Sequence, residues 1–112
     1  MTLAQLIEKT GFQPITTQSN LDAEVTGGIC CDLLSWVIAR GAPGMAWVTV
    51  QTHMNVVAVA ALHEFSCVIL AEGCEMDADV VKKAESQGVT VLSAKGSEYT
   101  LSGMLYELGI GK

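Results

Sequence analysis

The sequence predicts an α/β domain, a three-layer α/β/α sandwich around a mainly parallel five-stranded sheet. Three short apolar runs rich in β-branched residues begin at Trp47, Val68 and Val89, at an even spacing along the chain. Helical patterns separate these runs, which is typical of buried parallel strands in β-α units. Right-handed crossovers then place helices on both faces of the sheet.

The N-terminal part of the chain predicts one helix and two short strands. Thr2 and Gln5 have the spacing of a capping box, which marks the start of the helix. The apolar face of that helix consists of Leu3, Leu6 and Ile7. Strands are expected at residues 13–17 and 24–29, and they are joined by a turn at residues 19–22.

Two helices are expected in the middle of the chain. The first covers residues 32–39 and ends at Gly41, and its apolar side consists of Leu33, Leu34, Val37 and Ile38. The second covers residues 56–65 with Asn55 as its N-cap. It is apolar nearly all round, so we expect it to be buried.

Two further helices complete the chain. Asp77 is expected to cap one that ends at Gly88, and Ser97 one that ends at Gly109. In the helix after Asp77, the residues expected to face inward are Val80, Val81 and Ala84. In the helix after Ser97 they are Leu101, Met104, Leu105 and Leu108. The predicted order is therefore α-β-β-α-β-α-β-α-β-α, in one domain that spans residues 1–112.

The composition excludes several classes of protein. Half of the 112 residues are hydrophobic and 16% are charged, which excludes intrinsic disorder. A net charge of −6 without a basic run argues against nucleic acid as a partner. No apolar stretch approaches the ~20 residues of a membrane span, and the N-terminus lacks a signal-peptide pattern. We therefore expect a cytoplasmic protein with reduced, mostly buried cysteines and no membrane contact.

Polar and glycine-rich segments suggest a site at one edge of the sheet. Open α/β sheets bind ligands at the carboxyl ends of their strands, where loops lead into helices. The candidate ligand-binding residues in such loops are Thr26, Gly27, Gly28, Gln51, Thr52, His53, Asn55, Glu72, Gly73, Ser93 and Lys95. Backbone N–H groups at helix starts favour a small anionic ligand, such as a nucleotide or a phosphorylated metabolite. The alternative is that these loops are polar only because every β-to-α connection needs capping residues and glycines.

His53 is the most distinctive residue of these loops. It could hydrogen-bond a ligand or carry a proton, or it could simply cap the helix that follows it. An enzyme of phosphoryl or acyl chemistry that uses His53 is therefore the alternative to a binding module. The chain lacks a phosphate loop and the usual zinc or dithiol spacings, so no catalytic residue, metal ligand or cofactor is assigned.

Several separated motifs resemble the DRTGG domain family. They are residues 22–28, 31–35, 47–60, 92–97 and 105–110, so the resemblance spans about residues 15–110. One departure is Ala23, which stands where the family name has arginine. The resemblance implies a fold similar to the N-terminal, non-catalytic domain of HPr kinase/phosphorylase, and a regulatory, ligand-sensing and dimerising role without kinase activity. It also implies a protein partner in a redox or hydrogenase system, because short chains of this kind are similar to proteins associated with iron-only hydrogenases.

The apolar content also predicts self-association. Two tryptophans, five methionines and a nearly uniformly apolar helix exceed what one small core accommodates. We therefore expect a homodimer or a higher symmetric oligomer. Together these observations predict a non-enzymatic regulatory module.

Overall fold

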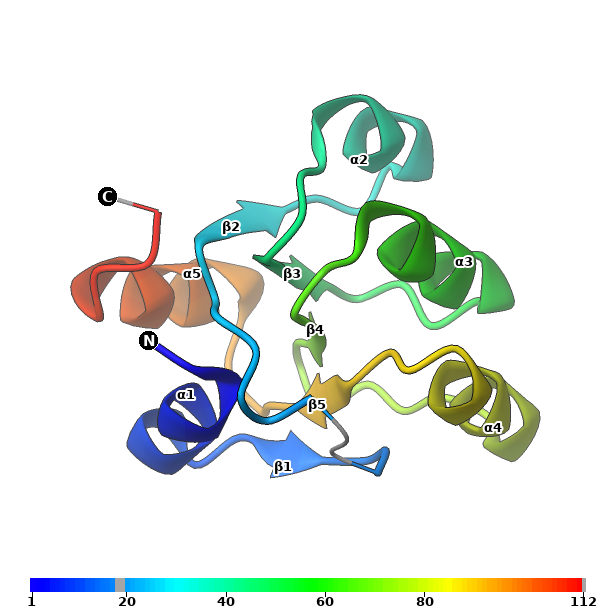
Figure 1. Ribbon diagram of the computed structural model, residues 1–112, viewed down its shortest axis with the longest axis horizontal. Helices are drawn as coiled ribbons and strands as arrows, with labels where there is room; N and C mark the ends of the chain where they lie inside the picture. The colour runs from blue at the N-terminus through cyan, green and yellow to red at the C-terminus, as the bar shows by residue number, and fades with distance from the viewer. Residues whose placement is uncertain (18–19, 112) are drawn as a thin grey trace.

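The computed structural model describes residues 1–17 and 20–111 (Figure 1). Its helices and strands follow one another in the predicted order, which confirms the α/β class. They are α1 (Leu3–Thr10), β1 (Gln13–Pro14), β2 (Gly27–Cys30), α2 (Leu34–Arg40), β3 (Met45–Thr49), α3 (Met54–His63), β4 (Cys67–Leu70), α4 (Ala78–Ser86), β5 (Val91–Ser93) and α5 (Glu98–Glu107). No helix of the described residues is long and apolar enough to cross a membrane.

The five strands form one mainly parallel sheet in the order β1-β5-β4-β3-β2. Strands β2 to β5 are parallel to their neighbours, and only β1 runs antiparallel, beside β5. All the loops that follow the parallel strands therefore emerge at the same edge of the sheet. The two outer strands, β1 and β2, leave the sheet with two free sides.

Helices cover both faces of the sheet, as a three-layer sandwich requires. In Figure 1, α1 and α5 lie on one face, whereas α2, α3 and α4 lie on the other. Alternate strand residues supply the two cores, because successive side chains of a strand point to opposite faces. Val48 and Ile69 pack in the core that includes α1 and α5, and Trp47 and Val68 pack in the core beneath α3 and α4.

The outer strands are shorter than predicted, for identifiable reasons. The strand expected at residues 13–17 ends after Pro14, because the Val91 N–H donates to the buried Thr16 hydroxyl instead of to backbone. The strand expected at residues 24–29 begins at Gly27 and ends at Cys30. Residues before Gly27 bond elsewhere: the Val25 N–H donates to the Met1 carbonyl. The first residue of the predicted turn, Ser19, lies outside the described residues.

The predicted helix ends are mostly correct, and the burial of α2 is the main error. The capping box of Thr2 and Gln5 forms as expected, and Ser97 caps α5. Val37 of α2 is buried and Leu34 packs partly buried against the same core, so only part of the expected apolar side of that helix enters the core. The apolar side chains exposed beside or on it are Leu33, Trp36 and Ile38.

The cap of α3 and the burial of Leu62 and of the cysteines also differ from what the sequence predicts. The N-cap of α3 is His53 and not Asn55, and Leu62 of that helix is 69% exposed. Among the cysteines only Cys67 is buried, which raises the pKa of its thiol to about 12. Cys30 is exposed, so a buried apolar role does not describe it.

Candidate functional site

Backbone hydrogen bonds join two of the loops that follow the parallel strands. The Glu72 N–H donates to the Gly96 carbonyl at 2.9 Å, and the Gly73 N–H donates to the Ala94 carbonyl at 2.8 Å. These bonds hold the loop after β4 against the loop after β5. The carboxyl edge of the sheet is therefore a built surface that positions its side chains.

Asp32, directly after β2, is the best-fixed side chain of this surface. Its Oδ1 accepts the Thr49 hydroxyl at 2.7 Å and the Val50 N–H at 2.9 Å. Partial burial works to raise the pKa of Asp32, but these hydrogen bonds to its charged form outweigh burial. The pKa of Asp32 therefore lies below its ordinary value, and the carboxylate stays charged at neutral pH.

Glu98, the first residue of α5, lies against Asp32. Burial raises the pKa of Glu98, and the hydrogen bond and negative charge of Asp32 raise it further. The Cys30 thiol donates to Glu98 Oε2 at 3.5 Å. Two carboxyl groups with opposite pKa shifts thus lie side by side, one fixed as an acceptor and the other inclined to keep a proton.

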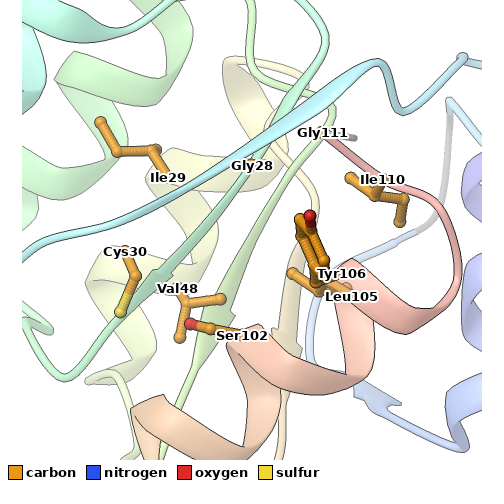
Figure 2. A pocket seen from close by; sticks show the side chains of 9 residues that line it. All are labelled: Gly28, Ile29, Cys30, Val48, Ser102, Leu105, Tyr106, Ile110 and Gly111. Carbon is orange, nitrogen blue, oxygen red and sulfur yellow. The ribbon is translucent and has the colours of Figure 1, made fainter.

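A cavity of about 240 Å³ lies next to this acid pair, between β2 and α5. Figure 2 shows its lining, which is mostly apolar: Gly28, Ile29, Cys30, Val48, Ser102, Leu105, Tyr106, Ile110 and Gly111. The buried hydroxyl oxygen of Ser102 has no hydrogen-bond partner among the described residues. Burial raises the pKa of the Cys30 thiol, and Ser102 lowers it in part, so the hydroxyl interacts with the thiol without a well-formed hydrogen bond.

The predicted site residues fall into separate places along the molecule. Gln51, Thr52 and His53 line a depression of about 430 Å³ that also includes Asp77 and Asp79. Ser93 and Lys95 line another, of about 390 Å³, between the end of α1 and α5. Asn55 is exposed at the start of α3, and Glu72 is exposed beside Gly73. These residues share one edge of the sheet but do not converge on one point.

Thr26, Gly27 and Gly28 were expected at the same edge, and that placement is wrong. Gly27 and Gly28 form the first half of β2, paired with Met45 and Ala46 at the start of β3. They therefore lie toward the amino ends of the strands. Their backbone has no positive φ, so the glycine pair is strand and not a loop.

The structure gives His53 a local role. Its Nδ1 accepts the Asn55 N–H at 3.1 Å and caps α3. This bond occupies the ring nitrogen that a general base would share with an orienting partner.

The acid pair of Asp32 and Glu98 is the feature that sequence reasoning missed. Each residue carried a local signal, since Asp32 directly follows a strand and Glu98 directly follows the N-cap Ser97. Only the fold brings the two together, because β2 and α5 are adjacent in space and distant in sequence.

Comparison with known proteins gives two findings and one negative. The model of the DRTGG domain matches residues 29–108. No curated protein matches the chain. The chain is similar to the crystal structure of the CBS and DRTGG domains from the regulatory region of Clostridium perfringens pyrophosphatase, complexed with its activator diadenosine tetraphosphate. The TM-score is 0.77 at 10% identity, covering 93% of this chain and 45% of that chain, so this chain spans less than half of the pyrophosphatase region.

The matched range begins just after the segment that resembles the family name. Without a gap, the letters D-R-T-G-G fall on residues 24–28. Val25, and not Ala23, then stands at the position of the arginine. Val25 is buried in the core that includes α1, so an apolar contact replaces any guanidinium there.

Proposed function

The chain belongs to the DRTGG domain family, and from this premise we propose that it is a regulatory, ligand-sensing module. The module acts without catalysis and as a homo-oligomer in the cytoplasm. Support comes from the family membership and from the likeness to a domain that serves in the regulatory region of a pyrophosphatase. A protein partner in a redox or hydrogenase system remains part of the proposal, and it rests on resemblance alone.

The ligand proposed is a nucleoside or nucleotide bound at the carboxyl edge. The observation that carries this assignment is the acid pair of Asp32 and Glu98, fixed where open α/β sheets bind ligands. Carboxylates at such strand ends accept hydrogen bonds from ribose hydroxyls. The pyrophosphatase region, of which this chain matches less than half, was crystallised with diadenosine tetraphosphate, and that supports the ligand class.

Charge decides how such a ligand would be oriented. Asp32, Glu72 and Glu98 repel phosphate, so the ribose faces the acid pair and phosphate groups extend away from it. Lys95 is the only cation in these loops and lies exposed on the side of α5. A nucleotide with several phosphates therefore needs Lys95 or a divalent cation to offset the acidic edge.

Thermal unfolding with a ligand panel tests the proposal. Nucleosides, mononucleotides and dinucleoside polyphosphates are added with and without Mg²⁺ at about a hundredfold excess over Kd. Binding to the folded state alone then contributes about 2.7 kcal/mol, or on the order of 10 °C in Tm. Glu98→Gln should reduce the shift for every binding ligand, whereas Lys95→Ala should reduce it only for phosphorylated ones.

Two controls sharpen the test. Lys82→Ala, exposed on α4, should leave every shift unchanged. The ligand should also be recovered chemically intact after incubation. A panel without any shift, or a shift that Glu98→Gln leaves intact, contradicts the assignment, and turnover of the ligand contradicts the non-catalytic role.

A further inference from the structure

We propose that the free side of β2 pairs antiparallel with β2 of a second copy of this chain, so that two sheets join into one. The inference rests on the homo-oligomer of the proposed function and names the surface that forms it. The nucleotide site at the carboxyl edge adjoins this surface through the contact of Cys30 with Glu98, but it is tested separately.

The direction of the backbone groups in β2 is the first observation. The Cys31 N–H donates to the Val48 carbonyl, and Cys30 is the register partner of Val48. In a parallel ladder, alternate residues direct both backbone groups to the same neighbour. Ile29 and Cys31 therefore face β3, whereas the N–H and C=O of Gly28 and Cys30 face outward from the sheet.

No strand of the described residues pairs with this outward side of β2, and the side matches itself. Gly111 approaches it at the Gly28 end, where a Cβ on Gly111 would lie 3.7 Å from the Gly28 nitrogen. Gly28 and Cys30 are exposed, and β2 contains no proline or charged side chain of the kind that protects free edges. A two-fold axis at Ile29 places Gly28 opposite Cys30 of the second copy. Gly28 of one copy and Cys30 of the other can then each donate an N–H to the carbonyl of the other. The two-fold axis repeats this pair of hydrogen bonds for the remaining two residues. The Cys30 side chain meets a glycine there, so no side chain obstructs it.

Apolar side chains flank the same strand on both faces of the sheet. Leu33 and Trp36 are 62% and 51% exposed on the α2 side, and Tyr106 is 59% exposed on the α5 side. Figure 2 shows Tyr106 on α5, on the wall of the cavity that faces β2. A four-residue strand alone buries far less than the ~800 Å² per partner of a stable interface. These side chains supply the apolar area that the strand lacks.

Charge favours a second copy as the occupant of this surface. The chain carries a net charge of −6, yet β2 and α2 contain no acidic residue. Asp32, between them, directs its carboxylate to Thr49 and Val50. Glu98, the other acidic group near this strand, accepts the Cys30 thiol of its own chain. Apart from Asp32 and Glu98, the side through which two copies would approach has no acidic side chain in β2 or α2, which keeps their mutual repulsion low.

Substitution of Gly28 tests the proposed pairing. Gly28→Pro removes one outward N–H and leaves the bonds to β3 in place, as Pro14 does in the edge strand β1. Gly28→Ala keeps the N–H, and its Cβ would lie 3.7 Å from its nearest neighbour, an ordinary contact. In light scattering after size exclusion, the wild type and Gly28→Ala should be dimers, and Gly28→Pro should dissociate at least about a hundredfold more readily.

Crosslinking tests the register even if Gly28→Pro fails to fold. Ile29 should face Ile29 of the second copy in a non-hydrogen-bonded pair, with Cα atoms about 4.5 Å apart, a distance that a disulfide spans. In a Cys30→Ser, Cys31→Ser background, Ile29→Cys should form a covalent dimer under mild oxidation. Gln13→Cys, on the opposite edge strand β1, should not.

The possible outcomes separate the two proposals. The β2 pairing alone is overturned if the wild type is a dimer and a folded Gly28→Pro variant is equally dimeric. It is also overturned if the Ile29→Cys variant does not crosslink. A monomeric wild type at micromolar concentration overturns the pairing and the homo-oligomer together. The ligand panel decides the sensing role independently of either result.

Discussion

The two free sides of the sheet are built in opposite ways. On one side, β1 is two residues long and contains Pro14, and the Thr16 hydroxyl takes the N–H of Val91 that a longer strand would have used. Beyond it, Thr17 donates its N–H and hydroxyl to Glu85. On the other side, the glycine-rich strand β2 directs the backbone groups of Gly28 and Cys30 outward, and both residues are exposed.

This difference indicates which side of the domain is used. Among the described residues, β1 is short, Pro14 has no N–H to donate, and the chain after it is held by side-chain hydrogen bonds, so this side offers little backbone for pairing. The β2 side combines an open strand, exposed apolar side chains, a cavity and the acid pair of Asp32 and Glu98. Edge strands are normally protected against pairing, so an unprotected one next to an apolar surface is typical of an interface.

The largest effect is expected from Gly44→Ala, which disturbs the start of β2. Gly44 has φ +85°, and a Cβ there would collide with the Thr26 hydroxyl, next to the hydrogen bond from the Thr26 N–H to the Gly44 carbonyl. The free energy of unfolding should fall by about 2–3 kcal/mol in urea titration. Gly73→Ala, at φ +67° with no atom within 4 Å, is the matched control and should cost about 1 kcal/mol. Equal losses would contradict the role given to the Thr26 contact.

Thr16→Val should open the β1 side. It removes the acceptor of the Val91 N–H at a residue that is 5% exposed, which leaves a buried donor without its partner. The expected loss is about 1–2 kcal/mol in the free energy of unfolding, without any change in dimer mass. A change in association state, with stability unaltered, would show that the β1 side has been misassigned.

The element order was predictable from the sequence, whereas the β2 side was not. Runs such as Trp47–Val50 and caps such as Ser97 are local signals, so they can be recognised in the sequence without knowing the fold. Gly27 and Gly28 look like a loop, because glycine permits many conformations and only the pairing with β3 shows that they are strand. Helical periodicity identifies an apolar side of α2 but does not say whether a core or a partner covers it.

The smallest effect is expected from Glu98→Gln. The pKa of Glu98 is raised in the folded protein. The wild type therefore loses stability as pH rises from the ordinary pKa of glutamate through the higher pKa of the folded state. A glutamine does not ionise, so the variant does not have this loss. At pH 7 the variant should be more stable by a few tenths of a kcal/mol, because solvent screens this partly exposed pair. The gain should vanish below about pH 4, where the wild-type residue is also neutral. Glu8→Gln, exposed on α1, is the control, and a gain of the same size at every pH would contradict the acid pair.

Amide hydrogen exchange along β2 tests the contrast between the two sides of the sheet most directly. The N–H groups of Ile29 and Cys31 face β3 and should exchange slowly at every protein concentration. Those of Gly28 and Cys30 should exchange quickly in dilute protein and become at least about tenfold slower as concentration rises and the second copy pairs with them. Exchange at Gly28 and Cys30 that stays fast at every concentration, or that is already slow in dilute protein, would contradict an open β2 edge that binds a second copy.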